Sequence, residues 1–132
     1  MSDWHTIPKR LLVPARVRRP PSEGWSWIDR RFVREHAPRL DRNAILLYFF
    51  LAAVSDRHGL SYWRDETIGG RLKLDVRAVT DARDELVRRD LVAYEAPLTQ
   101  ILSLPVQADP PRRGLRSLAG ILRDLSASDD QR

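Results

Sequence analysis

Residues 61–104 read SYWRDETIGGRLKLDVRAVTDARDELVRRDLVAYEAPLTQILSL and carry most of the information about the fold. The spacing of their apolar side chains predicts two helices joined by a tight turn, followed by two short apolar strands around a proline-containing loop. This order of elements is typical of a domain that is mainly α with a small β-hairpin. No other part of the chain points to a specific function.

The two expected helices are defined by their ends and by their buried positions. The first runs from about Asp65 to Arg71, and the carboxylates of Asp65 and Glu66 suit the positive end of its dipole. The second is capped by Asp75 and runs to about Arg89. Its buried stripe, at positions i, i+3 and i+7, consists of Val79, Ala82 and Leu86.

The strands are short and lie on both sides of these helices. Leu60–Trp63 is expected as a strand before the first helix. Leu91–Tyr94 and Gln100–Leu104 are expected to pair as a hairpin, with Glu95–Thr99 as the loop, or wing.

Upstream, a helix is expected from Arg42 to about Ser55, with Asp41 as its N-cap. Its sequence, NAILLYFFLAAVS, is apolar almost all round. Such a helix is buried on several sides, or is buried on one side and covered by a second subunit on the other. The pattern favours a central core helix over a dimer interface, and both can hold together.

A shorter helix is expected from Arg30 to His36, with Phe32 and Val33 facing inward and an end before the proline that follows. Trp25 and Trp27 alternate just before it, so that one of the two is expected to face inward. Packing is the preferred interpretation of these rings. A base-stacking platform for single strands would need a basic groove between them, and the sequence shows none.

The chain divides into four expected segments, because the prolines gather at its two ends. Residues 1–24 form a basic, proline-containing arm, and residues 25–104 form the folded domain. Residues 105–114 form a proline-containing linker, and residues 115–132 a short C-terminal helix and tail. The leucine stripe of that last helix can dock on its own domain or on a partner, and the sequence leaves this open.

Composition excludes several classes of site. The chain has no cysteine, and its three histidines share no ligand spacing, so that neither a metal site nor a cofactor is expected. The longest apolar run, Ala44–Val54, is far shorter than the roughly 20 residues that span a bilayer. No catalytic motif is present, and adjacent carboxylates such as Asp65 and Glu66 do not converge on one helix face. A cytoplasmic protein without enzymatic activity is the expectation.

The positive charge is unevenly distributed. Of the formal net charge of +5, residues 1–21 contribute +4, from five basic side chains against Asp3. Residues 61–90 hold seven basic and seven acidic side chains. Any positive field for nucleic acid therefore comes chiefly from the arm.

Residues 42–104 resemble the winged helix-turn-helix superfamily, in particular GntR-type regulators and plasmid replication initiators. The residues that carry the resemblance are Asp65-Glu66-Thr67-Ile68, Leu72, Leu74, Val79, Ala82, Leu86 and Asp90-Leu91-Val92. The resemblance implies a winged-helix fold and binding to duplex DNA, in transcription regulation or in replication and mobile-element maintenance. It implies that the 76–89 helix enters the major groove.

Three departures from the family pattern bear on the fold. Lys73 stands where these families usually place the turn glycine, and Asp90 replaces the usual glycine before the strand. Gly69 and Gly70 lie inside a helix, where each costs about 1 kcal/mol relative to alanine. Close approach of the second helix is the expected reason for Gly69.

The candidate DNA-binding residues fall into three groups. Arg77, Thr80 and Asp81 lie near the start of the second helix and are candidates for base contacts. Flanking positions can hold phosphates, and the arm can lie in a minor groove or on the backbone. The flanking candidates are Thr67, Arg71 and Lys73, and the arm candidates are Arg16, Arg18 and Arg19.

The exposed face of the second helix weakens the DNA interpretation. Arg77 with Asp81, and Asp84 with Arg88, are opposite charges at i, i+4 and can pair along the helix. A solvated, self-paired surface is then as good an interpretation as a base-reading one, and the arm can equally be a soluble tail. The alternative function is an interaction adaptor on the same scaffold, which engages protein partners. A homodimer through the 42–55 helix or the C-terminal helix is a further expectation.

Overall fold

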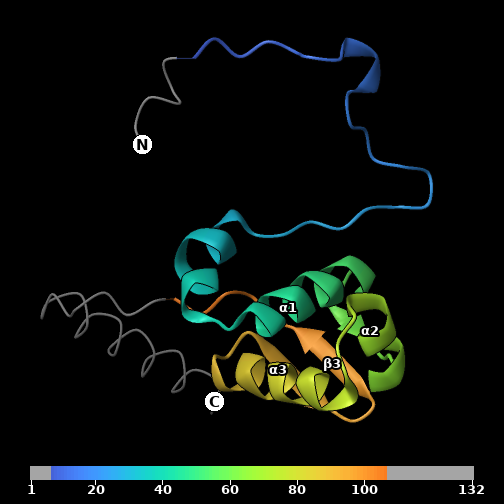
Figure 1. Cartoon of the computed structure of the whole chain (residues 1–132), viewed down its shortest axis with the longest axis vertical. Coiled ribbons are helices and arrows are strands. Elements are labelled where there is room, and N and C mark those ends of the chain that lie inside the picture. The colour runs from blue at the N-terminus through green and yellow to red at the C-terminus, as the bar shows by residue number, and fades with distance from the viewer. Residues whose placement is uncertain (1–6, 107–132) are drawn as a thin grey trace, which may run out of the picture.

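The computed structural model describes residues 7–106, which form a mainly helical body with a small antiparallel sheet (Figure 1). The expected C-terminal helix and most of the linker lie outside the described residues. The elements in chain order are η2 (Pro14–Arg16), η3 (Phe32–His36), η4 (Ala37–Arg39), α1 (Arg42–Val54), β1 (Leu60–Ser61), α2 (Asp65–Leu72), α3 (Val76–Arg88), β2 (Val92–Glu95) and β3 (Leu98–Ile101).

The core forms where α1 lies against α3, with α2 packed on both helices (Figure 1). From α1 it takes Ala44, Leu47, Tyr48 and Leu51, and from α3 the expected stripe of Val79, Ala82 and Leu86. Two α1 side chains, Leu46 and Phe49, remain partly exposed. The interpretation of α1 as a core helix is confirmed for its buried positions.

The connection between α2 and α3 follows from local chemistry. Lys73 takes the left-handed conformation (φ 60°) and ends α2, and Asp90 (φ 61°) does the same just after α3. Asp75 caps α3 as expected, because its Oδ1 accepts a hydrogen bond of 2.7 Å from the backbone N–H of Ala78. A Cβ at Gly69 would meet the carbonyl oxygen of Leu74, so that the chain at the turn, more than α3 itself, requires glycine there.

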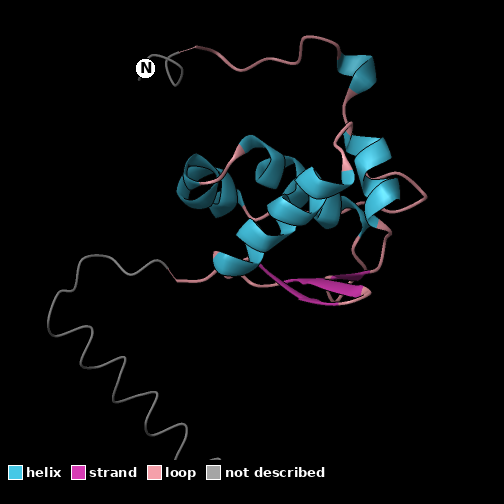
Figure 2. Cartoon of the chain, turned by 60° about the horizontal axis from the view of Figure 1, so that its bottom comes forward, coloured by secondary structure: helices cyan, strands magenta, loops and turns pink. Residues whose placement is uncertain are grey.

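The sheet has the strand order β1-β3-β2, and both pairings are antiparallel. Ser61 of β1 and Tyr94 of β2 both pair with Thr99 of β3, and Glu95 pairs with Leu98. Figure 2 shows the strands below the helices, at one edge of the body.

Two strand predictions were wrong in their bounds. The expected Glu95–Thr99 loop is only a two-residue turn at Ala96 and Pro97, and β3 begins at Leu98 instead of Gln100. Pro97 marked the position of the turn, but the ends of the strands are set by the pairing of Glu95 with Leu98, which apolar alternation does not show. β1 covers only Leu60–Ser61, so the expected strand to Trp63 is also too long.

The segment before α1 differs most from expectation. The expected 30–36 helix is a π-helical turn, η3, which continues through η4 across Pro38. Phe32 is buried and stacks on Tyr48, with ring centroids 3.8 Å apart, but Val33 is exposed. Trp25 and Trp27 are both exposed, so the prediction that one faces inward was wrong. An extended segment with no sheet partner places no ring inward by alternation alone.

The start of α1 is capped across the fold. Asp41 occupies the N-cap position, but its side chain makes no capping hydrogen bond. Its backbone N–H instead donates to Oε2 of Glu85 on α3, at 3.0 Å. A carboxylate at a helix N-terminus is favoured by the dipole, so Glu85 ties α3 to the beginning of α1.

Candidate nucleic-acid interface

The basic arm does not join the exposed residues of α3. Arg16, at the end of η2, and Arg18 and Arg19 after it are exposed, and no residue between 7 and 28 is buried. Figure 1 shows this segment, in blue, running away from the helical body. One hydrogen bond holds its end, because Ser26 Oγ donates to the carbonyl of Ala53, at 3.2 Å.

The first turns of α3 present the residues expected to contact bases. Arg77 and Asp81 form an ion pair of 4.0 Å, and their side chains are 90% and 70% exposed. The expected pairing along the helix is therefore present for these two residues. Asp84 and Arg88 form no ion pair with each other or with other side chains of the described range. Their predicted pairing was wrong, and Arg88 stays exposed.

Thr80 is less free than its exposed position suggests. Its hydroxyl lies 3.1 Å from the carbonyl oxygen of Val76 and 3.4 Å from Oδ2 of Asp65. The hydroxyl donates one proton to these two acceptors, and Thr80 is consequently oriented toward α2. A base contact by Thr80 would have to compete with both.

A buried ion pair joins α2 to α3 and was not predicted from the sequence. Arg83 on α3 and Asp65 on α2 form a two-pronged ion pair in which Nη1 lies 3.2 Å from Oδ2 and Nη2 contacts Oδ1. The Arg83 side chain is 5% exposed and that of Asp65 is 25% exposed. Hydrogen bonding from Arg83 is the main reason that the pKa of Asp65 lies below its ordinary value. The guanidinium also lies 4.3 Å from the ring centroid of Tyr94 on β2, so that one arginine connects three elements.

The flanking candidates occupy different surroundings. The guanidinium of Arg71 lies 5.8 Å from the ring centroid of Trp63, and Trp63 itself packs edge-on against Phe50 of α1. Thr67 on α2 and Lys73 in the turn are exposed. Lys73 lies in the turn just before α3. The guanidinium of Arg71 lies instead against Trp63, in the connection between β1 and α2.

An acidic groove of about 550 Å³ runs beside the exposed face of α3 and the start of α1. Its lining includes five carboxylates and two guanidinium groups. The carboxylates are those of Asp41, Asp75, Asp81, Asp84 and Glu85, and the cations are Arg77 and Arg88. Within residues 7–106 no three carboxylates or histidines converge in a way that would hold a metal ion. The excess of carboxylates makes this side of α3, including the surroundings of Arg77, unfavourable for phosphate.

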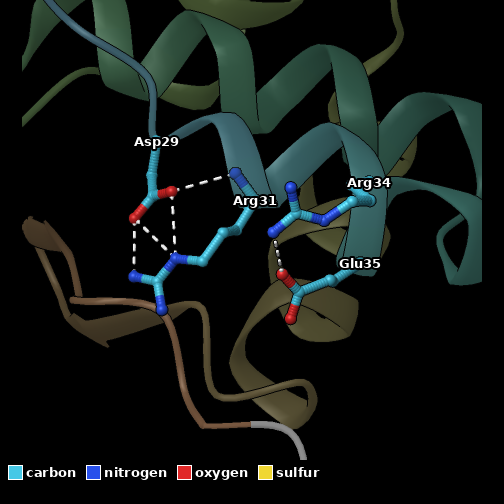
Figure 3. Close-up of polar contacts among 4 residues, drawn as sticks. All are labelled: Asp29, Arg31, Arg34 and Glu35. Atoms are coloured by element: carbon cyan, nitrogen blue, oxygen red, sulfur yellow. Dashed lines mark hydrogen bonds and ion pairs between the residues drawn. The ribbon is translucent and has the colours of Figure 1, made fainter.

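The arginines before α1 are partly neutralised by their neighbours, as Figure 3 shows. Asp29 accepts from the backbone N–H of Arg31 and from its guanidinium, with Oδ2 2.7 Å from Nη2. These hydrogen bonds lower the pKa of Asp29 to about 2. Arg34 pairs with Glu35 at 2.8 Å. These two contacts neutralise Arg31 and Arg34, whereas Arg30 and Arg39 of the same segment remain exposed.

No helix among residues 7–106 has the length and apolar character needed to cross a membrane. Comparison of the chain with protein-family models, with curated protein sequences and with solved structures finds no match in any of the three.

Proposed function

We propose that the chain is a cytoplasmic winged-helix DNA-binding protein that contacts duplex DNA through the start of α3. The observation that carries this proposal is the position of Arg77. Its side chain is 90% exposed on the first turn of a capped, well-packed helix, next to the exposed Lys73 of the turn. A guanidinium held there can contact a guanine edge bidentately, while the lysine contacts a phosphate.

The order of elements supports the winged-helix assignment. Helix α1, strand β1, the α2–turn–α3 pair and the β2–β3 hairpin follow each other as the resemblance implies. The hairpin then corresponds to the wing. Its short turn carries no basic side chain, so that wing contacts to phosphate play little part in this mechanism.

The arm supplies most of the attraction to DNA in this proposal. Arg16, Arg18 and Arg19 are exposed, and their segment runs away from the helical body in Figure 1. They contribute affinity that depends on salt, whereas Arg77 contributes sequence preference. The role in the cell is transcription regulation or accessory function in replication and mobile-element maintenance.

The test begins with selection of bound sequences from random duplex DNA, followed by titrations at two salt concentrations. Arg77→Ala is expected to relax the sequence preference, and Arg18→Ala to lower affinity uniformly and reduce the salt slope by about 1. Arg88→Ala is the matched control, since it removes the same charge at the other end of α3. Duplex binding that survives the loss of both Arg77 and the three arm arginines would overturn this mechanism.

A second function, an adaptor that binds protein partners, is favoured by the acidic groove beside α3. Its carboxylates suit a basic partner segment. A homodimer through α1 would use the partly exposed Leu46 and Phe49. Absence of any DNA shift at low salt, with a stable hetero-complex that Asp81→Asn and Asp84→Asn disrupt, would favour the adaptor.

A further inference from the structure

Helix α1 has an exposed face without the usual polar side chains. Leu46 is 37% exposed and Phe49 is 36% exposed, and Ala53, one turn further along, is also exposed. These residues are spaced i, i+3 and i+7 and therefore lie on one face of the helix. Between Asn43 and Val54 the helix has no charged side chain. The outer face of a surface helix is normally polar, so that this face is expected to be covered.

The segment before η3 enlarges this face. Ser26 Oγ donates to the carbonyl of Ala53 at 3.2 Å, which holds the segment alongside α1 (Figure 1). The residues on either side of Ser26, Trp25 and Trp27, are 69% and 75% exposed. Exposed apolar side chains that gather in one place mark a binding surface. The apolar patch is defined here as Trp25, Trp27, Leu46, Phe49 and Ala53.

The apolar patch has the size of one short helix. From Leu46 to Ala53 the exposed face of α1 extends roughly 10 Å along the helix axis. The patch has few side chains, whereas each partner of a stable dimer commonly contributes about 20–30 residues. A second copy bound through this patch alone would be held weakly. The patch therefore fits a helix with a single apolar stripe better than it fits a second domain.

The chain itself has a segment of this kind. The expected C-terminal helix, which lies outside the described residues, has one stripe formed by Leu115, Leu118, Leu122 and Leu125. Charged and small side chains occupy most of the positions between these leucines. A helix of about 11 residues is marginal alone and needs an apolar surface to pack on. The patch and the stripe are thus complementary in chemistry and in length.

The described part of the chain ends within reach of the patch. Leu104 is buried in the same core cluster as Phe32, whose ring centroid lies 5.6 Å from that of Phe49. Figure 1 shows the described chain ending at the side of the body where η3 and η4 lie. From Val106 to Leu115 an extended chain spans up to roughly 30 Å, whereas α1 is about 20 Å long. A segment tethered in this way meets the patch at an effective concentration of about millimolar, which favours it over a second copy.

We propose that the apolar patch is the docking site of this chain's own C-terminal segment, residues 115–125. The leucine stripe lies on Leu46, Phe49 and Ala53, and the two tryptophans border the contact. The docked segment keeps this face of α1 closed to a second copy, and its release opens the face. This proposal does not rest on DNA binding, which involves the start of α3 and the arm.

The test uses the absence of cysteine from the chain. Ala53→Cys with Ala119→Cys places one thiol in the patch and one beside the leucine stripe, where a short bifunctional maleimide can join them. Val87→Cys with Ala119→Cys is the matched control, since Val87 is 42% exposed on α3, outside the patch. In dilute solutions of the full chain, the first pair is expected to link within one chain at least about tenfold faster than the second.

Two further variants test whether the leucine stripe is responsible. Leu118→Ser with Leu122→Ser interrupts the stripe and leaves residues 25–104 unchanged. It is expected to abolish the difference in rate between the two cysteine pairs. Arg116→Ser with Arg123→Ser changes the other side of the expected helix and is expected to preserve that difference. Circular dichroism of each variant checks that the helical content of the body is kept.

The proposal is overturned if the two cysteine pairs link at equal rates, or if the interrupted stripe links as fast as the intact one. Links that form only between chains, in proportion to the protein concentration, would also overturn it and would assign the patch to a second copy. Because no DNA is present, a failed DNA titration leaves this result unaffected.

Discussion

Helix α3 carries two arginine–aspartate pairs that differ in burial and therefore in what they do. Arg77 and Asp81 lie on the outside, 4.0 Å apart and largely exposed. Arg83 reaches inward to Asp65 of α2 and is almost fully buried. The charges of the outer pair are solvated, so its loss costs little, whereas removal of one inner partner leaves a buried group without compensation. A spacing of four residues between opposite charges identifies Arg77 and Asp81, but the pair that stabilises the fold is Arg83 with Asp65, which no sequence spacing indicates.

The largest difference between the two pairs is expected on removal of a carboxylate. Asp65→Ala leaves the guanidinium of Arg83 buried without its ion partner, which we expect to lower the free energy of unfolding by about 3 kcal/mol. Asp81→Ala is the matched control on the exposed pair, with an expected loss below about 0.5 kcal/mol. Urea unfolding of both variants measures the contrast. Equal losses would show that burial does not separate the two pairs.

Replacement of both inner partners by apolar residues tests whether the pair itself stabilises the fold. Asp65→Leu with Arg83→Met removes both charges and keeps volume at the α2–α3 contact. We expect this double variant to recover to within about 1 kcal/mol of the unmodified chain, since a buried pair seldom exceeds a packed apolar contact in stability. A loss as large as that of Asp65→Ala would assign the cost to packing against Tyr94 instead of to the unpaired charge.

Acid should separate the pairs by a smaller amount. Because the folded-state pKa of Asp65 lies below its ordinary value of 3.8, its contribution to stability is complete above that value and declines as the pH falls below it. Asp65→Asn should therefore lose less stability than the unmodified chain when the pH is lowered through this range. Asp29, whose pKa is lowered to about 2 by Arg31, lies outside the α2–α3 contact, and Asp29→Asn provides the comparison. Identical acid dependence of the chain and of Asp65→Asn would contradict the role of Asp65.

The smallest stability effect is expected at Arg77, where the functional effect should be the largest. Arg77→Ala should change the free energy of unfolding by less than about 0.5 kcal/mol. In the DNA titrations it should reduce discrimination against a mismatched base by about 1–3 kcal/mol. If Arg77→Ala lowers the free energy of unfolding strongly and keeps the sequence preference, Arg77 serves the fold and not base contacts.

The sequence predicted the parts of the fold that depend on local periodicity. The stripe of Val79, Ala82 and Leu86 is buried, Asp75 caps α3, and the helices over 65–72 and 42–54 are present. Each of these follows from residues close together in the chain. The mainly helical class with a small sheet followed from the same patterns.

The remaining features depend on contacts between distant residues. Arg83 lies four positions after Val79 and three before Leu86, which does place it on the inner face, but nothing local identifies Asp65 as its partner. Glu85 as a cap for Asp41 is a contact across 44 positions. The exposed Trp25 and Trp27 show the same limit, because a ring is buried only where another element covers it. The DNA-binding residues remain predictions, since their exposure allows a contact without proving one.

Helix α3 lies between two non-glycine residues in the left-handed conformation, Lys73 and Asp90, and the two offer different opportunities for engineering. Glycine at either position would release backbone strain, a gain of up to about 1 kcal/mol that the greater freedom of the unfolded chain reduces. At Asp90 the exchange also removes a negative charge from the helix end, so stability and attraction to a polyanion improve together. At Lys73 the same exchange removes a cation beside Arg77, so under the proposed DNA contact the gain in stability would come with weaker phosphate binding. The proposal therefore predicts that Asp90→Gly raises stability without loss of DNA affinity, whereas Lys73→Gly raises stability and lowers DNA affinity.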